Sequence, residues 1–404
     1  MAFEFSFAPE HEMFRRTLRG FLDEEIRPRI DDEFYDSEAF PWDLVTPMAE
    51  QGLFGVTVPP EYGGAGLGEI GYGILLEELA KVDTGLSTIV GAHTGICLAP
   101  IYLFGTEEQK ERYLPPLCRG EDIGAFALTE PQAGSDAANI KTRAERDGDE
   151  YVLDGTKIYV SNGDVADTLM VSAVTDPALG ARGGVTAFIV DSDWDGFEVS
   201  SKEDKMGIRR STTAQIEFDG CRVPEENVLG NVGEGFIVAL TALDGGRATL
   251  AAGSIGGATE ALNRAVDYAN AREQFGDPIA HHQDVQFKLA EMSTDITQAR
   301  YATYHCLEYV EEYYEQIAAG EDVSKAFREK VSRRSAQVKI AASEMAAEVT
   351  EKACDIMGAR GLAEGYGVEK GLRDSPIAEI YEGTNEIQRM IIGREVAQEG
   401  GYAW

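Results

Sequence analysis

The sequence is poor in cysteine, histidine and positive charge, and each shortage argues against a class of site or partner. Its 404 residues include five cysteines without a C-x-x-C pair and five histidines without an H-E-x-x-H spacing. Neither a disulfide framework nor a metal site is therefore predicted. Lysine and arginine total 36 against 71 aspartates and glutamates, which gives a formal charge of −35. Such a surface repels nucleic acid and anionic membrane, so neither is an expected partner.

The sequence also has no recognisable secretion leader and no long apolar run. Its first residues, MAFEFSFAPEHEMF, lack a basic segment followed by an apolar one, and no apolar stretch reaches the roughly 18 residues of a membrane span. We therefore expect a soluble, cytoplasmic protein. Because of its large negative charge, the folded protein should be more stable in concentrated salt, where the Debye length falls to about 3 Å at 1 M. A halophilic origin is predicted, with an acidic protein of ordinary cytosol as the alternative.

The pattern of apolar and polar residues changes twice along the chain. Residues 1–121 read as helices, for example HEMFRRTLRGFLDEEI and IGYGILLEELAKV. Residues 122–235 contain alternating β-branched segments separated by Asp-Gly pairs, as in DEYVLDGTKIYV and TAQIEFDGCRV. Residues 236–404 return to long helices joined by short links, which suggests a bundle. We predict an α+β protein with these three domains.

A glycine-rich hexapeptide imitates a dinucleotide-binding fingerprint. GLGEIG, residues 66–71, satisfies G-x-G-x-x-G, and Asp83 follows at a suitable distance for a ribose contact. A true fingerprint needs a strand that runs directly into the first glycine, whereas here VPPEYGGA intervenes and its prolines interrupt any strand. We interpret the glycines as a loop.

One acid near the carboxyl terminus raises a question. In IAEIYEGTNEIQRMI, residues 377–391, Ile387, Met390 and Ile391 predict a short amphipathic helix capped by Thr384 or Asn385. Glu382 could then be a solvated acid that is favoured by the dipole of this helix. It could also be a chemical group, and these residues alone leave both interpretations open.

A second segment carries hydroxyl groups and small residues after a predicted strand. In FALTEPQAGSDAANIKTRA, residues 126–144, Thr129 and Ser135 supply hydroxyls, and Ala133-Gly134 allow backbone amides to approach a ligand closely. Such an arrangement suits a flat ring or a phosphate. The alternative is an ordinary polar turn.

These two segments, together with KIYVSNG, KMGIRRSTTAQIEFDGCRVPEENVLG and AREQFGDPIAHHQDVQFKLAEM, resemble the acyl-CoA dehydrogenase family. The resemblance covers nearly the whole chain, with the motifs in the family's order. It implies a helical amino-terminal domain, a central β-barrel, a carboxy-terminal four-helix bundle and FAD as the cofactor.

The resemblance also implies which residues bind FAD, some of them from a neighbouring subunit. The implied contacts are Phe126, Leu128, Thr129, Ser135, Tyr159, Ser161, Arg272, Phe275, Gln283, Asp355, Gly358, Thr384 and Glu386. Tyr159 stands where relatives commonly have Trp, and Ser161 replaces the usual Thr. Asp355, Ala359 and Arg360 depart from the family's Gln and glycines, which puts the cofactor contact of that loop in doubt.

Glu382 occupies the position of the family's catalytic base. A minority of relatives place the base on the helix that contains DGGR, at a position that is Gly246 here and cannot serve. The resemblance implies substrate contacts at Ser135, Asp244, Arg247 and Gly383. A base that abstracts a proton from a weak carbon acid needs a raised pKa, so we expect Glu382 to be desolvated.

The function implied is dehydrogenation of an acyl-CoA thioester to the trans-2-enoyl-CoA, with electrons passed to an electron-transfer flavoprotein. The expected assembly is a homotetramer or a dimer. The alternatives are an acyl-CoA oxidase, a decarboxylating glutaryl-type enzyme, for which no arginine in the acyl pocket is identified, and a non-catalytic acyl-CoA-binding scaffold.

Overall fold

Helices form the amino-terminal part of the chain in the computed structural model, which describes residues 7–33 and 39–398. They are α1 Pro9–Phe21, α2 Arg27–Glu33, α3 Trp42–Glu50, α4 Gly68–Val82, α5 Thr84–Val90, α6 Ala99–Phe104 and α7 Glu107–Cys118. A capping box starts α7, because Thr106 accepts the Gln109 N–H at 3.2 Å while the Gln109 side chain accepts the Thr106 N–H at 3.0 Å.

A π-helical segment, Gly91–Leu98, joins α5 to α6, so that Thr84–Phe104 forms one continuous helix. This helix is long and apolar enough to cross a membrane, a feature that the search for uninterrupted apolar runs did not predict. However, 78% of its most apolar stretch is buried inside the protein. We therefore interpret it as a core helix.

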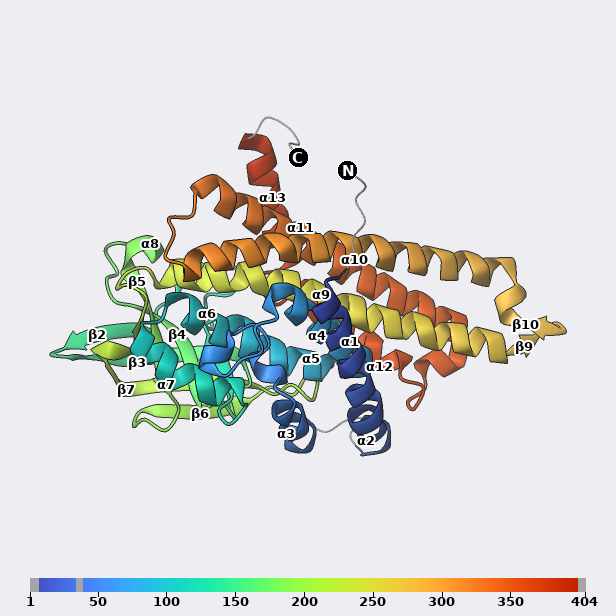
Figure 1. Cartoon of the computed structure of the whole chain (residues 1–404), viewed down its shortest axis with the longest axis horizontal. Coiled ribbons are helices and arrows are strands. Elements are labelled where there is room, and N and C mark those ends of the chain that lie inside the picture. Colours follow the sequence, from blue (N-terminus) through green and yellow to red (C-terminus); the bar gives the residue numbers. More distant parts are fainter. Residues whose placement is uncertain (1–6, 34–38, 399–404) are drawn as a thin grey trace.

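The middle of the chain forms a twisted sheet at one end of the molecule (Figure 1). Its strands are β1 Gly124–Ala127, β2 Arg143–Asp147, β3 Glu150–Ser161, β4 Thr168–Val174, β5 Val185–Asp191, β6 Phe197–Lys202, β7 Thr213–Pro224 and β8 Val228–Leu229, with the short turn α8 Ala181–Gly184 before β5. The strand order is β6-β7-β3-β2-β4-β5-β8, and β1 pairs with β4 in parallel. The alternating segments thus form the predicted β-domain.

This sheet is open, so the predicted barrel is wrong in that respect. Strands β6 and β8 are the two edges and do not pair with each other in the described chain. In the described chain, the ladder between the two halves of the sheet is the single pair Arg143 of β2 and Val174 of β4. Bulges in β3 bend the sheet without closing it.

Three long helices run along the longest axis of the molecule (Figure 1): α9 Gly235–Ala271, α10 Gln283–Ala318 and α11 Lys325–Met357. The hairpin β9 Glu273–Gln274 and β10 Asp277–Pro278 separates α9 from α10, and α12 Val368–Asp374 and α13 Asn385–Gln398 complete the bundle. Small buried residues recur along α9 at helical spacing, including Ala251, Ala258, Ala265 and Ala269. They let neighbouring helices approach α9 closely.

Helix α4 also packs tightly against α9, since a Cβ atom added to Gly256 would lie 2.1 Å from the Glu77 carbonyl oxygen. The GLGEIG segment leads into α4 rather than following a strand: a 3₁₀ turn, Pro60–Tyr62, precedes it, and α4 begins at Gly68. The dinucleotide-fingerprint interpretation therefore has no structural support.

Candidate active site

Glu382 lies in the loop 375–384 between α12 and α13, and this loop is fixed at both ends. At its start, the Asp374 carboxylate accepts the Ile208 N–H at 2.6 Å. At its end, the Gln388 amide donates to the carbonyl oxygens of Gly383 at 2.7 Å and Glu382 at 3.2 Å. The backbone of Glu382 is left-handed, with φ at 55°, a conformation that is uncommon for a residue with a side chain. The anchors thus hold Glu382 in one orientation.

The Glu382 carboxylate faces α9 at Gly246. A Cβ atom added to Gly246 would lie 2.2 Å from Oε2 of Glu382, so the absence of a side chain there makes room for the acid. That Oε2 atom is buried and has no hydrogen-bond partner among the described residues. Burial raises the pKa of Glu382 to about 7, although the positive charges of Arg247 and Lys339 oppose the rise. The carboxylate is desolvated, as expected for a general base.

Two cations near Glu382 are held by other groups. Arg247 donates to the Glu382 carbonyl oxygen at 3.1 Å and to the Asp244 carboxylate at 2.6 Å. Lys339, which is fully buried on α11, donates to the Asn385 side chain at 2.8 Å. Burial lowers the pKa of Lys339 to about 8, while the charge of Glu382 opposes this. Arg247 and Lys339 balance the acid without forming an ion pair with it in the described chain.

The hydroxyl-bearing segment and β3 form a second wall. The Ile158 N–H donates to the Thr129 carbonyl oxygen at 2.9 Å, and the buried Lys157 ammonium donates to the Leu128 carbonyl oxygen at 3.0 Å. Lys157 also pairs with the buried Glu130 at 2.7 Å. These contacts place Leu128 and Thr129 beside the strand that carries Tyr159 and Ser161.

Helix α5 connects this wall to the loop 375–384. The buried Asn162 side chain donates to the Ile89 carbonyl oxygen at 3.0 Å. The preceding residue of α5, Thr88, forms a side-chain hydrogen bond with Tyr381. The segment ending β3 and the residue before Glu382 thus lie against successive residues of one helix.

The predicted cofactor residues near this wall leave polar and aromatic groups exposed. Tyr159 is 63% exposed and has a φ of 56°, which turns it out of the strand. Ser135 is exposed, Phe126 is half-buried and Leu128 is buried. Such a wall offers backbone groups, a hydroxyl and an aromatic face, which fit an isoalloxazine ring.

At the start of α13, the Thr384 hydroxyl accepts the Ile387 N–H at 3.4 Å, which agrees with the predicted cap. Glu386, in the first turn of that helix, is exposed.

A third group of predicted residues lies far from Glu382. Arg272 and Phe275 are exposed on the hairpin after α9, and Gln283 begins α10. From Gly246 to Arg272 the chain rises through 26 residues, almost all in α9, which is about 39 Å at 1.5 Å per residue. Figure 1 shows the hairpin at the end of the molecule opposite the sheet.

Asp355 and Gly358 lie at the same remote end. The Lys288 ammonium on α10 pairs with the Asp355 carboxylate near the end of α11. Arg360 lies over the rings of Tyr268 and Tyr366, so this departure from the family pattern is accommodated by cation–π contacts. The structure therefore gathers the predicted residues in two places, one around Glu382 and the β-domain wall, the other around the hairpin.

Lys339, Asn385 and Gln388 contribute to the site but were not among the residues predicted to do so. Lys339 had a detectable signal, since it is a charge at helical spacing within the apolar run SAQVKIAAS. Asn385 was predicted only as a possible helix cap, and no pattern in the sequence marks Gln388; the roles of both depend on where the loop 375–384 turns.

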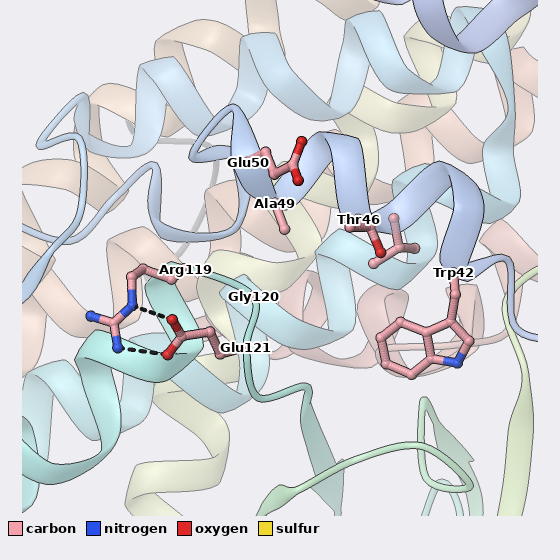
Figure 2. Close-up of a pocket in the computed structure, with 8 residues that line it drawn as sticks. Trp42, Thr46, Ala49, Glu50, Arg119, Gly120 and Glu121 are labelled. Atoms are coloured by element: carbon pink, nitrogen blue, oxygen red, sulfur yellow. Dashed lines mark hydrogen bonds and ion pairs between the residues drawn. The ribbon is translucent and has the colours of Figure 1, made fainter.

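A hollow of about 410 Å³ lies elsewhere, between α3 and the segment that follows α7 (Figure 2). Trp42, Thr46 and Ala49 line one side, and Arg119 and Glu121 face them. The Arg119 guanidinium and the Glu121 carboxylate form two hydrogen bonds, of 2.9 and 2.7 Å, so these charges satisfy each other. No predicted site residue lines this hollow, and we assign it no function.

Comparison with known proteins agrees with this geometry over the whole chain. The sequence matches the family models described as the acyl-CoA dehydrogenase N-terminal domain over residues 8–121, middle domain over 125–221 and C-terminal domain over 233–397. The chain belongs to the acyl-CoA dehydrogenase family. Members of this family are flavin-dependent oxidoreductases.

Individual relatives cover nearly the full length of this acyl-CoA dehydrogenase family member. The short-chain specific acyl-CoA dehydrogenase of Clostridium acetobutylicum is 39% identical over 97% of this chain and 99% of its own. The structure of butyryl-CoA dehydrogenase from Megasphaera elsdenii aligns with a TM-score of 0.90 and 37% identity, covering 98% of this chain and 100% of that one.

A chain in a structure described as the electron transferring flavoprotein of Acidaminococcus fermentans aligns with a TM-score of 0.91 and 40% identity. The alignment covers 97% of this chain and 99% of that chain.

Proposed function

We propose that this acyl-CoA dehydrogenase family member oxidises an acyl-CoA thioester to the trans-2-enoyl-CoA with Glu382 as its catalytic base. The observation that carries the proposal is the Glu382 carboxylate: its Oε2 atom is buried and has no partner among the described residues, and it lies against a position without a side chain. The pKa of about 7 leaves a substantial ionised fraction near neutral pH. A carboxylate in this state can accept a proton from carbon.

The chain's own residues then do three things. Glu382 takes the proton from the carbon next to the thioester carbonyl, and its negative charge is lost in that step. Arg247 holds the Glu382 backbone, and its pairing with Asp244 keeps both groups in the place proposed for contact with the thioester. FAD, when bound, supplies the acceptor for the hydride that leaves the neighbouring carbon. One proton and one hydride lost from adjacent carbons leave a carbon–carbon double bond.

The residues present fit FAD, but only if two copies of the chain cooperate. The flavin ring would be held close to Glu382 by Leu128, Thr129, Ser135, Tyr159 and Ser161. Arg272 is exposed and forms no ion pair in the described part of the chain, and Phe275 is 98% exposed with a φ of 58°. A cation and a projecting ring suit a pyrophosphate and an adenine. Because they lie about 39 Å along α9 from the base, we propose that they serve the FAD of a neighbouring copy.

This arrangement implies a homodimer at least, and a tetramer remains the proposed assembly. The further proposed cofactor contacts are Thr384, Glu386, Gln283, Asp355 and Gly358. For Asp355 the proposal is weakened by its pairing with Lys288.

The relatives point to a short acyl group and to an electron-transferring flavoprotein as partner. A short-chain specific enzyme and a butyryl-CoA dehydrogenase align over nearly the whole chain. We extend both features to this protein as proposals, with Gly383 and Ser135 as further substrate contacts. A cytoplasmic location and a halophilic origin are also proposed, and the charge of −35 supports the second.

The proposal is tested by mixing the purified protein anaerobically with acyl-CoA thioesters of increasing length and following bleaching of the flavin absorbance. We expect bleaching by short thioesters and transfer of the electrons to an electron-transfer flavoprotein. Rapid oxygen consumption would indicate an oxidase, and carbon dioxide release would indicate a decarboxylating enzyme. Protein that binds acyl-CoA but retains no flavin would support the non-catalytic scaffold.

A further inference from the structure

A second buried acid, Glu69, lies near the same side chains as Glu382. It is 6% exposed in the first turn of α4. Burial, followed by the charges of both Glu69 and Glu382, raises the pKa of Tyr72. The pKa of Tyr314 on α10 is likewise raised by burial first and then by charges that include both acids. Tyr72 follows Glu69 by one turn of α4, and Tyr314 follows Glu311 by one turn of α10, where the Glu311 carboxylate accepts the Glu69 N–H at 3.0 Å. Both tyrosines therefore lie near Glu69.

The tyrosines occupy the space that small residues leave. The Tyr314 hydroxyl donates to the Thr241 carbonyl oxygen at 3.0 Å, and a Cβ atom added to Gly245 would lie 2.1 Å from it. The Tyr72 hydroxyl donates to the Gly91 carbonyl oxygen at 3.2 Å and forms a hydrogen bond with Thr249. Thr249 lies one turn of α9 beyond Gly246, the residue that faces Glu382. The tyrosine hydroxyls thus lie beside the part of α9 that faces Glu382, and Glu69 and Glu311 lie one turn before these tyrosines on α4 and α10.

The carboxyl group of Glu69 has no protein partner in the described chain. It forms neither a hydrogen bond nor an ion pair within residues 7–33 and 39–398. Its neighbour Glu311 on α10 is also an acid, and the Glu311 carboxylate accepts the N–H groups of Glu69 at 3.0 Å and Ile70 at 3.2 Å. Buried polar side chains almost always have a partner, so the Glu69 carboxyl group has hydrogen-bonding capacity left for a ligand or a water molecule beside it.

We propose that Glu69, with Tyr72 and Tyr314, forms the far end of the acyl pocket and selects acyl groups whose end carries no negative charge. The inference rests on the proposed function and narrows its substrate class. The two rings restrict the length of the acyl group. A terminal carboxylate would be buried against Glu69 and Glu311, and neither acid is paired with a cation in the described chain. Thioesters of dicarboxylic acids are therefore disfavoured.

The protonation state of Glu69 supports this selection and makes it depend on pH. Burial, and after it the charge of Glu311, raises the pKa of Glu69 to about 8. The groups that face it from α4 and α10 are Tyr72, Tyr314 and Glu311, which are neutral or acidic. Glu69 is mostly protonated at pH 7 and becomes an anion above about pH 8. Discrimination against a terminal carboxylate should therefore increase as the pH rises through that value.

The test compares two five-carbon acyl groups, pentanoyl-CoA and glutaryl-CoA, which differ in a terminal methyl or carboxylate. Their kcat/KM values, and their Kd values from the shift of the flavin spectrum, are measured from pH 6.5 to 9 on the FAD-loaded protein. The wild type is expected to favour pentanoyl-CoA by at least about 100-fold, as a site that leaves a buried polar group unpaired can do. The preference should increase at high pH.

Glu69→Gln removes the ionisable group and supplies an amide N–H. It should raise the glutaryl-to-pentanoyl ratio at least about tenfold at pH 8 and above and make the ratio independent of pH, because the like charge is gone. Glu311→Gln, which keeps an oxygen acceptor for α4, should raise the ratio less. Glu312→Gln, an exposed acid on the same helix, is the matched control.

Equal use of the two thioesters by the wild type would overturn the proposal. It would also be overturned if the ratio and its pH dependence were the same in Glu69→Gln, Glu311→Gln and wild type. The Kd ratios report the selection even without turnover. A flavin-loaded protein that binds pentanoyl-CoA but bleaches with no thioester would contradict the proposed dehydrogenation and leave the Kd comparison to decide the role of Glu69.

Discussion

The loop 375–384 and the hairpin that runs from Arg272 to Gln283 contrast sharply within this one chain. The loop is anchored by Asp374 and Gln388, and the carboxylate that it presents lies against α9 with its Oε2 atom buried. Residues 272–277 of the hairpin are exposed, and Phe275 at its tip is 98% exposed. Both segments carry residues that the family resemblance assigns to the reaction. Under the proposed function, the chain completes the proton-abstracting part of the site by itself, whereas the hairpin is proposed to act on the FAD of a neighbouring copy.

The contrast predicts that small changes around the loop impair chemistry without loosening the fold. Gly246→Ala places a Cβ atom 2.2 Å from Oε2 of Glu382, and the carboxylate must move because it is the end of a flexible side chain. A displacement of about 1 Å can cost about 100-fold in rate. Flavin bleaching should fall by that order, measured by anaerobic stopped flow.

The same substitution should leave stability unchanged or raise it, because Ala is favoured over Gly in a helix by about 1 kcal/mol. Gly393→Ala in α13 is the control, since an added Cβ atom there meets nothing within 4 Å. A Gly246→Ala protein that bleaches as fast as Gly393→Ala would mean that the carboxylate does not work in the position described.

At the hairpin, the expected effect is on cofactor retention. Arg272→Ala should weaken FAD binding by about 10- to 100-fold, because hydrogen bonds to charged groups contribute about 1.5–3 kcal/mol. The measurement is the release of FAD on dilution, followed by its fluorescence. Arg16→Ala, an exposed arginine on α1, is the control.

Because the hairpin is proposed to serve a neighbouring copy, FAD retention by the wild type should also depend on protein concentration. The proposed role of the hairpin would be contradicted if Arg272→Ala released FAD at the rate of the Arg16→Ala control. It would also be contradicted if FAD release from the wild type did not depend on protein concentration.

Near the loop, Lys339 is expected to adjust the pKa of Glu382 without itself accepting the proton. Its positive charge lowers the pKa of Glu382, so Lys339→Gln should raise that pKa above about 7 while the glutamine keeps a donor for Asn385. Since the base acts when ionised, the rate rises with pH through its pKa, and the profile should move to higher pH. At a pH below the midpoint, each unit of upward shift lowers the ionised fraction about tenfold.

The pH dependence of flavin bleaching measures this shift. A profile that stays in place or moves to lower pH would show that the Lys339 charge does not act on Glu382.

The smallest expected effect belongs to the surface as a whole. With a formal charge of −35, self-repulsion should fall as salt screens it, so the melting temperature should rise from dilute buffer to molar potassium chloride. Each 1 kcal/mol gained corresponds to about 2–4 °C or less for a chain of this size. A melting temperature that is highest in dilute buffer would contradict the halophilic origin and leave the chemistry untouched.

The order of helical, β and helical regions was predictable because each type of element has its own apolar periodicity, as in HEMFRRTLRGFLDEEI and DEYVLDGTKIYV. The open sheet was not, because its two halves meet at the single pair Arg143 and Val174, and pairing between distant strands leaves little trace in the sequence. The family resemblance implied a closed barrel, which the strand order contradicts.

For the proposed site, the motif pointed to Glu382, whereas no motif pointed to its neighbour Lys339. Lys339 lies 43 residues earlier on another helix, and only the packing of α11 brings its charge near the base. Glu69 was not predicted because it lies inside the GLGEIG segment, whose glycines indicate a loop, and only the fold buries its side chain.

The most direct test of the central claim is flavin bleaching by Glu382→Gln in a single anaerobic turnover with a good short-chain thioester. Glutamine keeps the shape of the side chain but cannot take the proton, so the rate should fall by at least the roughly 10²–10⁴-fold that general base catalysis contributes, while the thioester still binds. Glu364→Gln, an exposed acid, should bleach at the wild-type rate. If Glu382→Gln bleaches within a few fold of wild type, Glu382 is only an acid before a helix, where losing its charge costs at most about 1 kcal/mol, and the base lies elsewhere.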